Sequence, residues 1–437
     1  MSIDIKEKKI RKRFGFLDLL LSAIGSTIGA GIFVLLPIGI NIAGIGIILS
    51  LILASVVTIV VAFNYGELAA SLPFEGGGYS WVAAAFGKES VSFIVGWLVW
   101  LGNMGYAALS ALGFAIYAGM LFNTVNPIPL ALLALLFFVI LNVITMKTSI
   151  GIEKLLTILI LLAFFIFWVY LGTDFNPNNF RYYFYQIKFI PIFTAASLLY
   201  VLFIGFEAIS SVSAEAKKSI DLPRSFVYCV AIVSAVYIVT SVMIFGVVSS
   251  SEINNQTILN ISGPLAPLII LAAIFATLTS MNAGLIAASR NVYALSRDEM
   301  MPRLLGRISR DFSTPFIAVA VSGLISALLI MTNAVEYVAS IADFGYLICI
   351  SMVCSSLIFL RIANRELNRP YKVPLYPYTS LLGIILPLIL LIFLEEKAIE
   401  TGLIWILIGF FVYTFYKLVK IEIRKKTRFS KFLRRFF

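Results

Sequence analysis

Twelve apolar segments, separated by short clusters of charged or turn-forming residues, constrain the fold of this chain more than any other feature. About 20 apolar residues in a helix cover the roughly 30 Å hydrocarbon core of a bilayer. The chain is 61% hydrophobic and 13% charged, whereas soluble domains have roughly 45–50% and 25%. These features predict an all-α polytopic membrane protein with 12 transmembrane helices. The predicted helices span residues 17–40, 43–72, 90–122, 127–146, 154–172, 190–213, 224–248, 263–296, 314–332, 335–361, 378–394 and 401–419.

The basic residues predict the orientation of these helices. Lys and Arg collect on the cytoplasmic side of membranes. With the amino terminus inside, all but three of the 33 basic residues fall in cytoplasmic segments, the exceptions being Arg181, Lys188 and Lys397. Both termini are therefore expected in the cytoplasm. The net charge of +11 is concentrated in residues 417–435. This position indicates contact with anionic membrane lipid rather than with nucleic acid.

Several classes of enzyme and cofactor site have no support in the composition. The chain has no histidine, and its three cysteines lie inside apolar segments at Cys229, Cys349 and Cys354. This pattern fits no disulfide framework and no metal site. The glycines after Glu75 lack the Lys-Ser/Thr pair of a phosphate-binding loop, so we expect a tight turn at the membrane surface. We predict no cofactor, no metal and no enzymatic activity.

The first apolar segment is interrupted in its middle. Residues 25–33 contain three glycines and two hydroxyl residues, which weaken a helix where no water can satisfy freed amides. Gly25 and Gly29 also form a GxxxG pair, which commonly marks close helix packing. A second interruption lies at residues 202–208, around Gly205. Matched interruptions in two halves of a membrane protein indicate a central transport site.

Two acidic residues lie deep inside apolar segments, Glu207 and Asp343. An intramembrane carboxylate costs several kcal/mol unless it is protonated, paired or hydrated. Glu207 is therefore the first candidate for proton coupling and Asp343 the second. The alternative for Glu207 is a structural carboxylate bonded to backbone amides of the first, interrupted helix. Asp18 and Glu67 lie near predicted helix ends, where snorkelling and pairing with basic residues explain them.

Four ordered motifs carry a resemblance to a known family. They are GSTIGAGIF at residue 25, YGELAASLP followed by GGGYSW, FIGFEAISSVSAEAKKSIDLPRS at residue 203, and MNAGLIAASRNVYALSRDEMMP at residue 281. Over nearly its whole length the chain resembles the amino acid-polyamine-organocation superfamily of secondary transporters. The resemblance implies one transporter domain over residues 1–420 and a basic cytoplasmic tail over 421–437. Within the domain it implies inverted repeats at about 17–172 and 190–361, with two further helices at about 378–419.

The resemblance also implies a substrate site where the two interrupted helices meet. The carboxylate of an amino acid is expected at the amides of Ala30 and Gly31, because a helix start favours an anion. Its ammonium group is expected at the carbonyls of Thr27, Val201 and Ile204. The full predicted set is Thr27, Gly29, Ala30, Gly31, Val201, Ile204 and Gly205 for binding, and Tyr106, Phe203 and Phe206 as pocket or gate residues.

The pocket residues favour a neutral or hydrophobic amino acid. The chain departs from some relatives at Ile160, where they carry a lysine in the position of a sodium ion, and at Val201, where certain arginine exchangers carry a tryptophan. We predict a permease of the cell membrane that moves amino acids by alternating access, driven by protons or by exchange. The alternatives are a polyamine or organic-cation permease and a non-transporting sensor, and Thr279 and Ser280 keep sodium coupling open.

Overall fold

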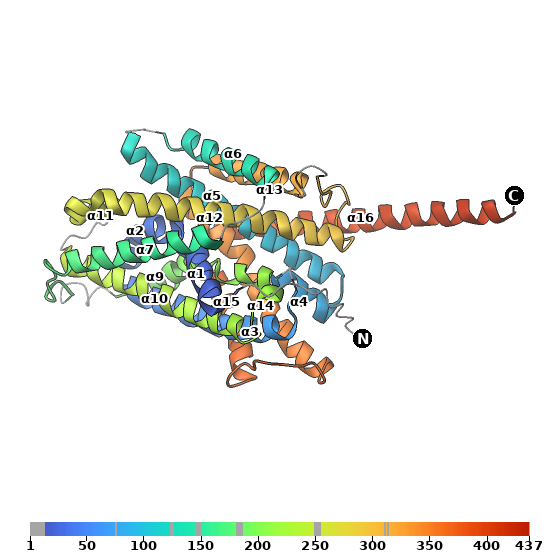
Figure 1. Ribbon diagram of the computed structural model, residues 1–437, viewed down its shortest axis with the longest axis horizontal. Coiled ribbons are helices and arrows are strands. Elements are labelled where there is room, and N and C mark those ends of the chain that lie inside the picture. The colour runs from blue at the N-terminus through green and yellow to red at the C-terminus, as the bar shows by residue number, and fades with distance from the viewer. Residues whose placement is uncertain are drawn as a thin grey trace.

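The computed structural model describes residues 14–74, 77–122, 126–145, 150–180, 187–248, 255–309, 312 and 314–436. The regular secondary structure of the described residues is helical, apart from one isolated bridge between Phe14 and Ala216. The helices run side by side in an elongated bundle, and the last helix projects far beyond it (Figure 1). We call the end from which that helix projects the α16 end. The predicted all-α class is confirmed.

The helices follow the predicted segments closely, within a few residues at most ends. The α-helices are α1 (Phe16–Thr27), α2 (Ala30–Ala43), α3 (Ile47–Ser71), α4 (Gly77–Phe86), α5 (Ser90–Phe122), α6 (Ile128–Ile144), α7 (Ile150–Leu171), α9 (Phe189–Leu198), α10 (Asp221–Val247), α11 (Asn255–Ser262), α12 (Ala266–Arg297), α13 (Phe316–Met331), α14 (Val335–Ala363), α15 (Tyr378–Ile392) and α16 (Glu396–Phe436). The 3₁₀-helices are η1 (Gly44–Gly46), η2 (Leu199–Phe203), η3 (Phe206–Glu215) and η4 (Gly263–Leu265).

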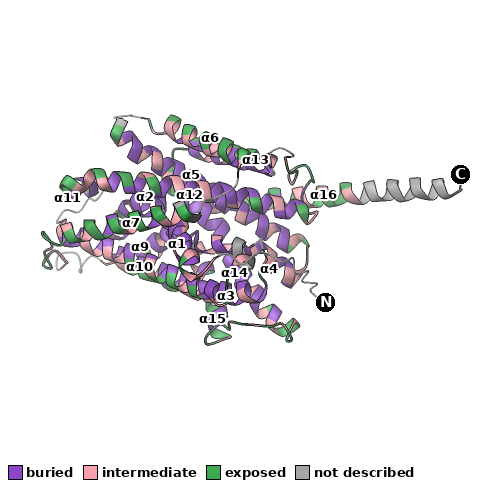
Figure 2. Ribbon diagram, in the orientation of Figure 1, coloured by how far each residue is buried: buried purple, intermediate pink, exposed green. Residues whose placement is uncertain are grey.

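Eight described helical stretches are long and apolar enough to cross a membrane. Four shorter apolar helices, α1, α6, α13 and α15, lie within four of the predicted segments. Figure 2 colours residues of α6, α13 and α16 as exposed, and large apolar residues are among them. Phe137, Leu324 and Phe411 are 61%, 63% and 72% exposed. Apolar surface on this scale is what a hydrocarbon environment stabilises and water does not, so the outer surface fits a multi-pass membrane protein.

Both predicted interruptions are present. The first helix ends at Thr27 and resumes at Ala30. The second passes from α9 into η2, breaks at Ile204 and Gly205, and continues as η3. We expected an α-helix up to residue 213, but the part after the break is a 3₁₀-helix. The tighter winding keeps backbone hydrogen bonds while the chain leaves the straight path of an α-helix.

The glycine-rich segment differs from the expected tight turn. Residues 77–86 form helix α4, which starts at Gly77 with a φ of +55° and buries Tyr79 and Trp81. Burial of these aromatic rings against the bundle outweighs the low helix propensity of glycine, since tertiary packing supplies most helical stability in proteins. Other predicted features fall outside the described residues: Glu75, Gly76, Arg181 and the basic amino-terminal stretch.

Glu67, near the end of α3, is completely buried, and it is paired with two arginines. Its Oε1 accepts a hydrogen bond from Arg361 Nε at 2.8 Å and lies 3.2 Å from Arg369 Nε. Its Oε2 accepts bonds from Arg361 Nη2 and from the backbone amide of Val373. The carboxylate therefore joins α3 to α14 and to the segment that follows α14. Of the two explanations expected for Glu67, pairing applies and snorkelling to water does not.

A second ion-pair cluster, at the α16 end, differs from the Glu67 cluster in being exposed. Glu299 lies 2.6 Å from Arg303 Nη2 and 2.5 Å from Lys420 Nζ. Hydrogen bonds from Lys420 and Arg303 lower the pKa of Glu299 to about 2. These pairs therefore persist at any physiological pH. They link the segment after α12 to α16.

Glu67→Ala should lower the free energy of unfolding by about 3–5 kcal/mol, because it leaves two partly buried arginines without their buried counter-charge. Thermal unfolding of the purified protein in detergent measures the change. The matched control is Glu299→Ala, which removes an exposed carboxylate and should leave the midpoint nearly unchanged. Equal shifts in the two variants would contradict a structural role for the buried cluster.

Candidate functional site

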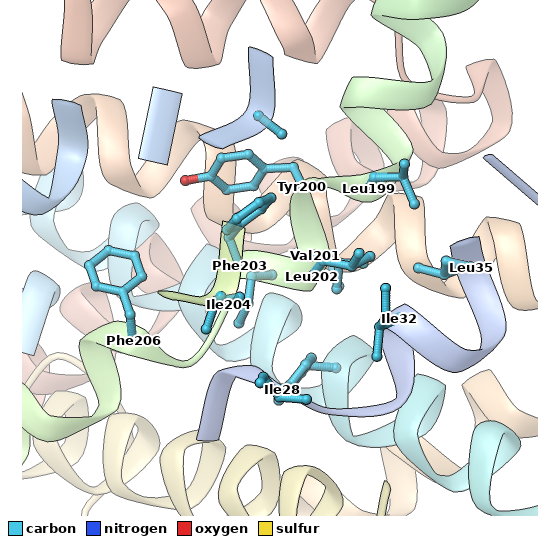
Figure 3. Packing of buried hydrophobic residues seen from close by; sticks show 14 of the residues in the cluster. Ile28, Ile32, Leu35, Leu199, Tyr200, Val201, Leu202, Phe203, Ile204 and Phe206 are labelled. Carbon is cyan, nitrogen blue, oxygen red and sulfur yellow. The ribbon is translucent and has the colours of Figure 1, made fainter. Parts of the chain in front are cut away.

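The two interruptions are in direct contact, and Gly205 makes that contact possible. Gly205 has a φ of +121°, a conformation that residues with a Cβ rarely adopt. A Cβ at this position would lie 2.3 Å from the carbonyl oxygen of Ser26 and 3.1 Å from Thr27 Cα. The backbone of the second break therefore packs directly against the last turn of α1. Figure 3 shows the same approach from the apolar side, where Ile28 and Ile32 face η2.

Two tyrosine hydroxyls bind the backbone carbonyls that the breaks leave free. The last carbonyls of a helix lack partners within it. Tyr106 of α5 donates to the Ser26 carbonyl at 2.8 Å. The hydroxyl of Tyr237 on α10 lies 2.9 Å from the carbonyl of Leu202 and 3.3 Å from that of Thr27. A hydroxyl carries one proton and donates it to one of these two carbonyls at a time. Because one carbonyl belongs to each break, Tyr237 bridges the two breaks.

A cavity of about 190 Å³ begins at the breaks and extends toward the α16 end, where α4 and the last third of α12 form its wall. Its lining includes Arg290 of α12, which is exposed, so the cavity reaches the surface there. Drug-sized ligands occupy sites of roughly 300–1,000 Å³. The smaller volume suits a single small metabolite.

The opposite side of the breaks is closed by packed apolar side chains. Ile32, Leu35, Leu202 and Phe203 are at most 2% exposed. Figure 3 shows them packed around η2 and the start of α2. Among the described residues, these side chains close the apolar side of the breaks, and the cavity opens on the other side.

Polar groups from three elements converge at the inner end of the cavity. The Glu207 carboxylate of η3 accepts a hydrogen bond from the backbone amide of Gly205 at 2.9 Å. Tyr346 of α14 has its hydroxyl beside this carboxylate, and it donates to Asn103 Oδ1 of α5 at 2.8 Å. A carboxylate, an amide and phenol groups at this end of the cavity provide acceptors for an ammonium group. They also provide a few oriented contacts for a small polar ligand.

Nearer the mouth, the cavity carries charges of both signs. Glu153 of α7 accepts a hydrogen bond from Ser22 of α1 at 2.8 Å. Glu153 and Arg290 interact electrostatically, and both line the cavity. Lys154 also pairs with Asp18 at 2.6 Å, so α7 and α1 are joined at two successive residues. A ligand that passes the mouth meets a cation on α12 and an anion on α7.

The structure brings some of the predicted site residues to the cavity and places others behind it. Tyr106, Ile204, Gly205 and Glu207 line it. The remaining predicted residues are not part of the lining in this conformation: Thr27, Gly29, Ala30, Gly31, Val201, Phe203, Phe206 and Asp343. Their predicted roles remain predictions.

Aromatic packing accounts for the positions of the two phenylalanines. Phe203 packs edge-on against Tyr237, with ring centroids 5.5 Å apart. Phe206 packs against Tyr65 and Phe226, with centroids 5.7 Å away in both cases. Both rings point into the core rather than into the cavity. In this conformation they support the second break from behind.

The sequence analysis did not select several polar residues that line or support the site, among them Ser22, Glu153, Tyr237, Arg290 and Tyr346. A signal was present for Tyr346, which follows Asp343 by one helical turn and so lies on nearly the same face. Arg290 and Glu153 are near helix ends, where a charged residue is ordinary. Tyr237 sits in a continuous apolar helix, and no local pattern distinguishes it from a core residue.

Comparison with known proteins now assigns the family. A family model described as amino acid permease matches residues 14–413. This chain belongs to the amino acid permease family. The match covers nearly the whole chain, and it confirms the resemblance to the amino acid-polyamine-organocation superfamily drawn from the four motifs. As a member of a transporter family, the chain is a membrane permease.

Individual relatives extend this result. The chain is 29% identical to the branched-chain amino acid permease BcaP of Bacillus subtilis, with 94% of each chain covered. It is 26% identical to the methylthioribose transporter of the same organism, with 95% of each covered. It is also 26% identical to BcaP of Lactococcus lactis, over 91% of this chain and 93% of the relative. The full-length relatives of this permease are thus named after more than one substrate.

Gly205→Ala should abolish transport by the permease, because its Cβ would collide with the Ser26 carbonyl and separate the two breaks. The matched control is Gly87→Ala. Gly87 also has a positive φ, of +85°, but nothing lies within 4 Å of its added Cβ. Uptake into vesicles, normalised to the amount of folded protein, measures both. Wild-type uptake by Gly205→Ala would refute the requirement for close contact between the breaks.

Proposed function

We propose that this permease carries neutral, hydrophobic amino acids, branched-chain ones first, across the cell membrane by alternating access coupled to protons. The observation that carries the proposal is the cavity that starts at the contact of the two helix breaks. A closed apolar layer on one side and an open passage on the other are what one state of an alternating-access cycle requires. The passage also suits a small ligand in volume.

The proposed topology has twelve membrane crossings in two inverted five-helix repeats plus two final helices. Short apolar helices that lie in the predicted segments support this count. The distribution of Lys and Arg supports a cytoplasmic location for the α16 end and for both termini. In this orientation the conformation described here is open to the cytoplasm.

The proposed substrate position combines the helix breaks with the cavity. The carboxylate of the amino acid would approach the first amides of α2, at Ala30 and Gly31, where the helix dipole favours an anion. The ammonium group would lie near Glu207 and the backbone carbonyl of Ile204, which both belong to the second break. The side chain would face the apolar part of the wall, and the branched-chain relatives support an aliphatic one.

Two other substrate classes are less well supported. A polyamine favours a site lined by acids alone, but Arg290 lines this cavity and repels a multiply charged cation. Methylthioribose is a neutral sugar derivative, and the transporter that carries its name is a full-length relative. It has no ammonium group for Glu207. The two classes are therefore included as competitors in the experiment below.

Uptake by purified protein in liposomes tests the proposal. Labelled leucine, isoleucine and valine should accumulate when an inward proton gradient is imposed, and unlabelled branched-chain amino acids should compete. Spermidine and methylthioribose should compete weakly or not at all. Accumulation of either compound in place of the amino acids would overturn the substrate assignment. Accumulation that requires amino acid preloaded inside, with no effect of the gradient, would make the protein an exchanger.

Glu207→Gln should reduce proton-driven uptake at least tenfold, because the amide keeps the shape of the carboxyl group but cannot bind and release a proton. The measurement is the initial rate of leucine uptake as a function of the pH difference. The control is Glu153→Gln, which changes a second cavity carboxylate held by Ser22, and it should retain the pH dependence. Unchanged pH dependence in Glu207→Gln would refute its coupling role.

A further inference from the structure

Two of the four sequence motifs meet beside the cavity. Tyr79 of α4 belongs to the GGGYSW motif, and Asp298 and Met300 belong to the motif that begins at Met281 and follows α12 to its end. The Tyr79 hydroxyl donates to Asp298 Oδ2 at 3.1 Å and lies 3.1 Å from Met300 Sδ. Tyr79 is buried and lines the cavity. Asp298 therefore reaches a wall residue of the site from outside the cavity.

The backbone at the end of α12 fixes the position of Asp298. The amides of Glu299 and Met300 donate to carbonyls of the last turns of α12, at 3.0 and 2.9 Å. These two bonds form a Schellman motif, in which Glu299 takes the left-handed position with a φ of +58°. Glycine is the usual residue there, because a Cβ makes the conformation strained. The ion pairs of Glu299 with Arg303 and Lys420 offset this strain.

The carboxylate of Asp298 joins both ends of α4 to α12. Its Oδ2 binds Tyr79, the third residue of α4, and its Oδ1 lies 2.7 Å from Nζ of Lys88, which follows α4 by two residues. Arg297 Nε lies further away, at 3.6 Å. The Asp298 side chain is only 9% exposed. Hydrogen bonds to a charged group are roughly twice as strong as neutral ones, so this carboxylate is a firm attachment for α4.

On its other side, the start of α4 packs against the continuation of the second break. A Cβ on Gly77 would lie 2.8 Å from Ser210 Oγ of η3. Gly77 and Ser210 both line the cavity, and η3 also carries Glu207. Helix α4 thus lies between η3 and Asp298 without free space at Gly77. A shift of α4 changes the cavity wall on both sides.

We propose that Asp298 is a positioning residue of this permease, which holds Tyr79 and the start of α4 in the cavity wall and so stabilises the open conformation. Closing the cavity requires its wall elements, α4 and the last third of α12, to move relative to each other. The contacts of Asp298 stabilise the arrangement described here over any in which α4 has shifted. This inference rests on the proposed alternating access, and it concerns no particular substrate.

A thiol reporter in the cavity measures the open conformation without a substrate. Ala287 of α12 is half-buried and lines the cavity, so Ala287→Cys should react with a charged, water-soluble maleimide while the cavity is open. Asp298→Ala removes the acceptor and Tyr79→Phe removes the donor. Each should slow the reaction about fivefold, as expected for the loss of one hydrogen bond. The same variants without the reporter correct for native thiols, since Cys349 also lines the cavity.

A double variant tests whether Asp298 acts through Tyr79. If the two residues share one contact, Asp298→Ala combined with Tyr79→Phe should slow labelling no more than Asp298→Ala alone. The matched control is Tyr337→Phe. The hydroxyl of Tyr337 lies 2.8 Å from Thr401 Oγ1 and also joins two helices, α14 and α16, but neither residue is part of the cavity lining. This variant should leave the labelling rate unchanged.

The labelling rates of folded protein decide the proposal. Unchanged or faster labelling in Tyr79→Phe would overturn it, and so would additive effects of the two variants. Equal slowing in Tyr337→Phe would show a general loosening of the bundle and would also overturn it. If Asp298→Ala does not fold, Tyr79→Phe still decides, because it keeps the ring. Absence of leucine uptake by the wild type would refute the proposed function instead, and it would leave the labelling result unaffected.

Discussion

The close contact between the two interrupted helices is the constraint on which the rest of the structure depends. Inside a membrane, a broken helix is tolerated only where protein or a polar cavity satisfies the freed backbone groups. Here the two breaks pack against each other. Gly205 lies against the Ser26 carbonyl, and the Tyr237 hydroxyl bridges carbonyls from both breaks. The cavity begins beside this contact, at Ser26, Ile204 and Gly205. Gly205 and Glu207 bring the second break into its wall, and the neighbouring helices α5, α7, α12 and α14 supply most of its other polar groups.

The buried carboxylates of this chain are stabilised in two different ways. Glu67 is held by two arginines and a backbone amide, which fixes it in one arrangement. Glu207 has a backbone amide and neighbouring phenols, and Asp343 has no hydrogen-bond partner in the described part of the chain. A fully paired charge gives rigidity, whereas an acid without a counter-charge is stable only in its neutral form or in another conformation. The difference distinguishes the paired Glu67 from the two carboxyl groups for which we predict a transport role.

The family match and the geometry answer different questions. The match over residues 14–413 assigns the permease family. The named relatives act on substrates as different as branched-chain amino acids and methylthioribose. Family membership alone therefore leaves the substrate open. The charges that line the cavity, Glu207 at its inner end and the Glu153 and Arg290 pair near its mouth, are what favour a zwitterion.

The sequence by itself determined the elements that depend on local chemistry. Apolar segments of bilayer length predicted the helices. Glycines with hydroxyl residues predicted the first break and Gly205 predicted the second, because helix weakness is a property of neighbouring residues. Only the tertiary structure decided which groups face the cavity. Tyr346 and Arg290 reach it from distant helices, while the predicted Phe203 and Phe206 turn into the core. It also made a helix of residues 77–86, where an isolated chain would favour a turn. These outcomes depend on contacts between residues far apart in the chain, and such contacts leave no local pattern in a single sequence.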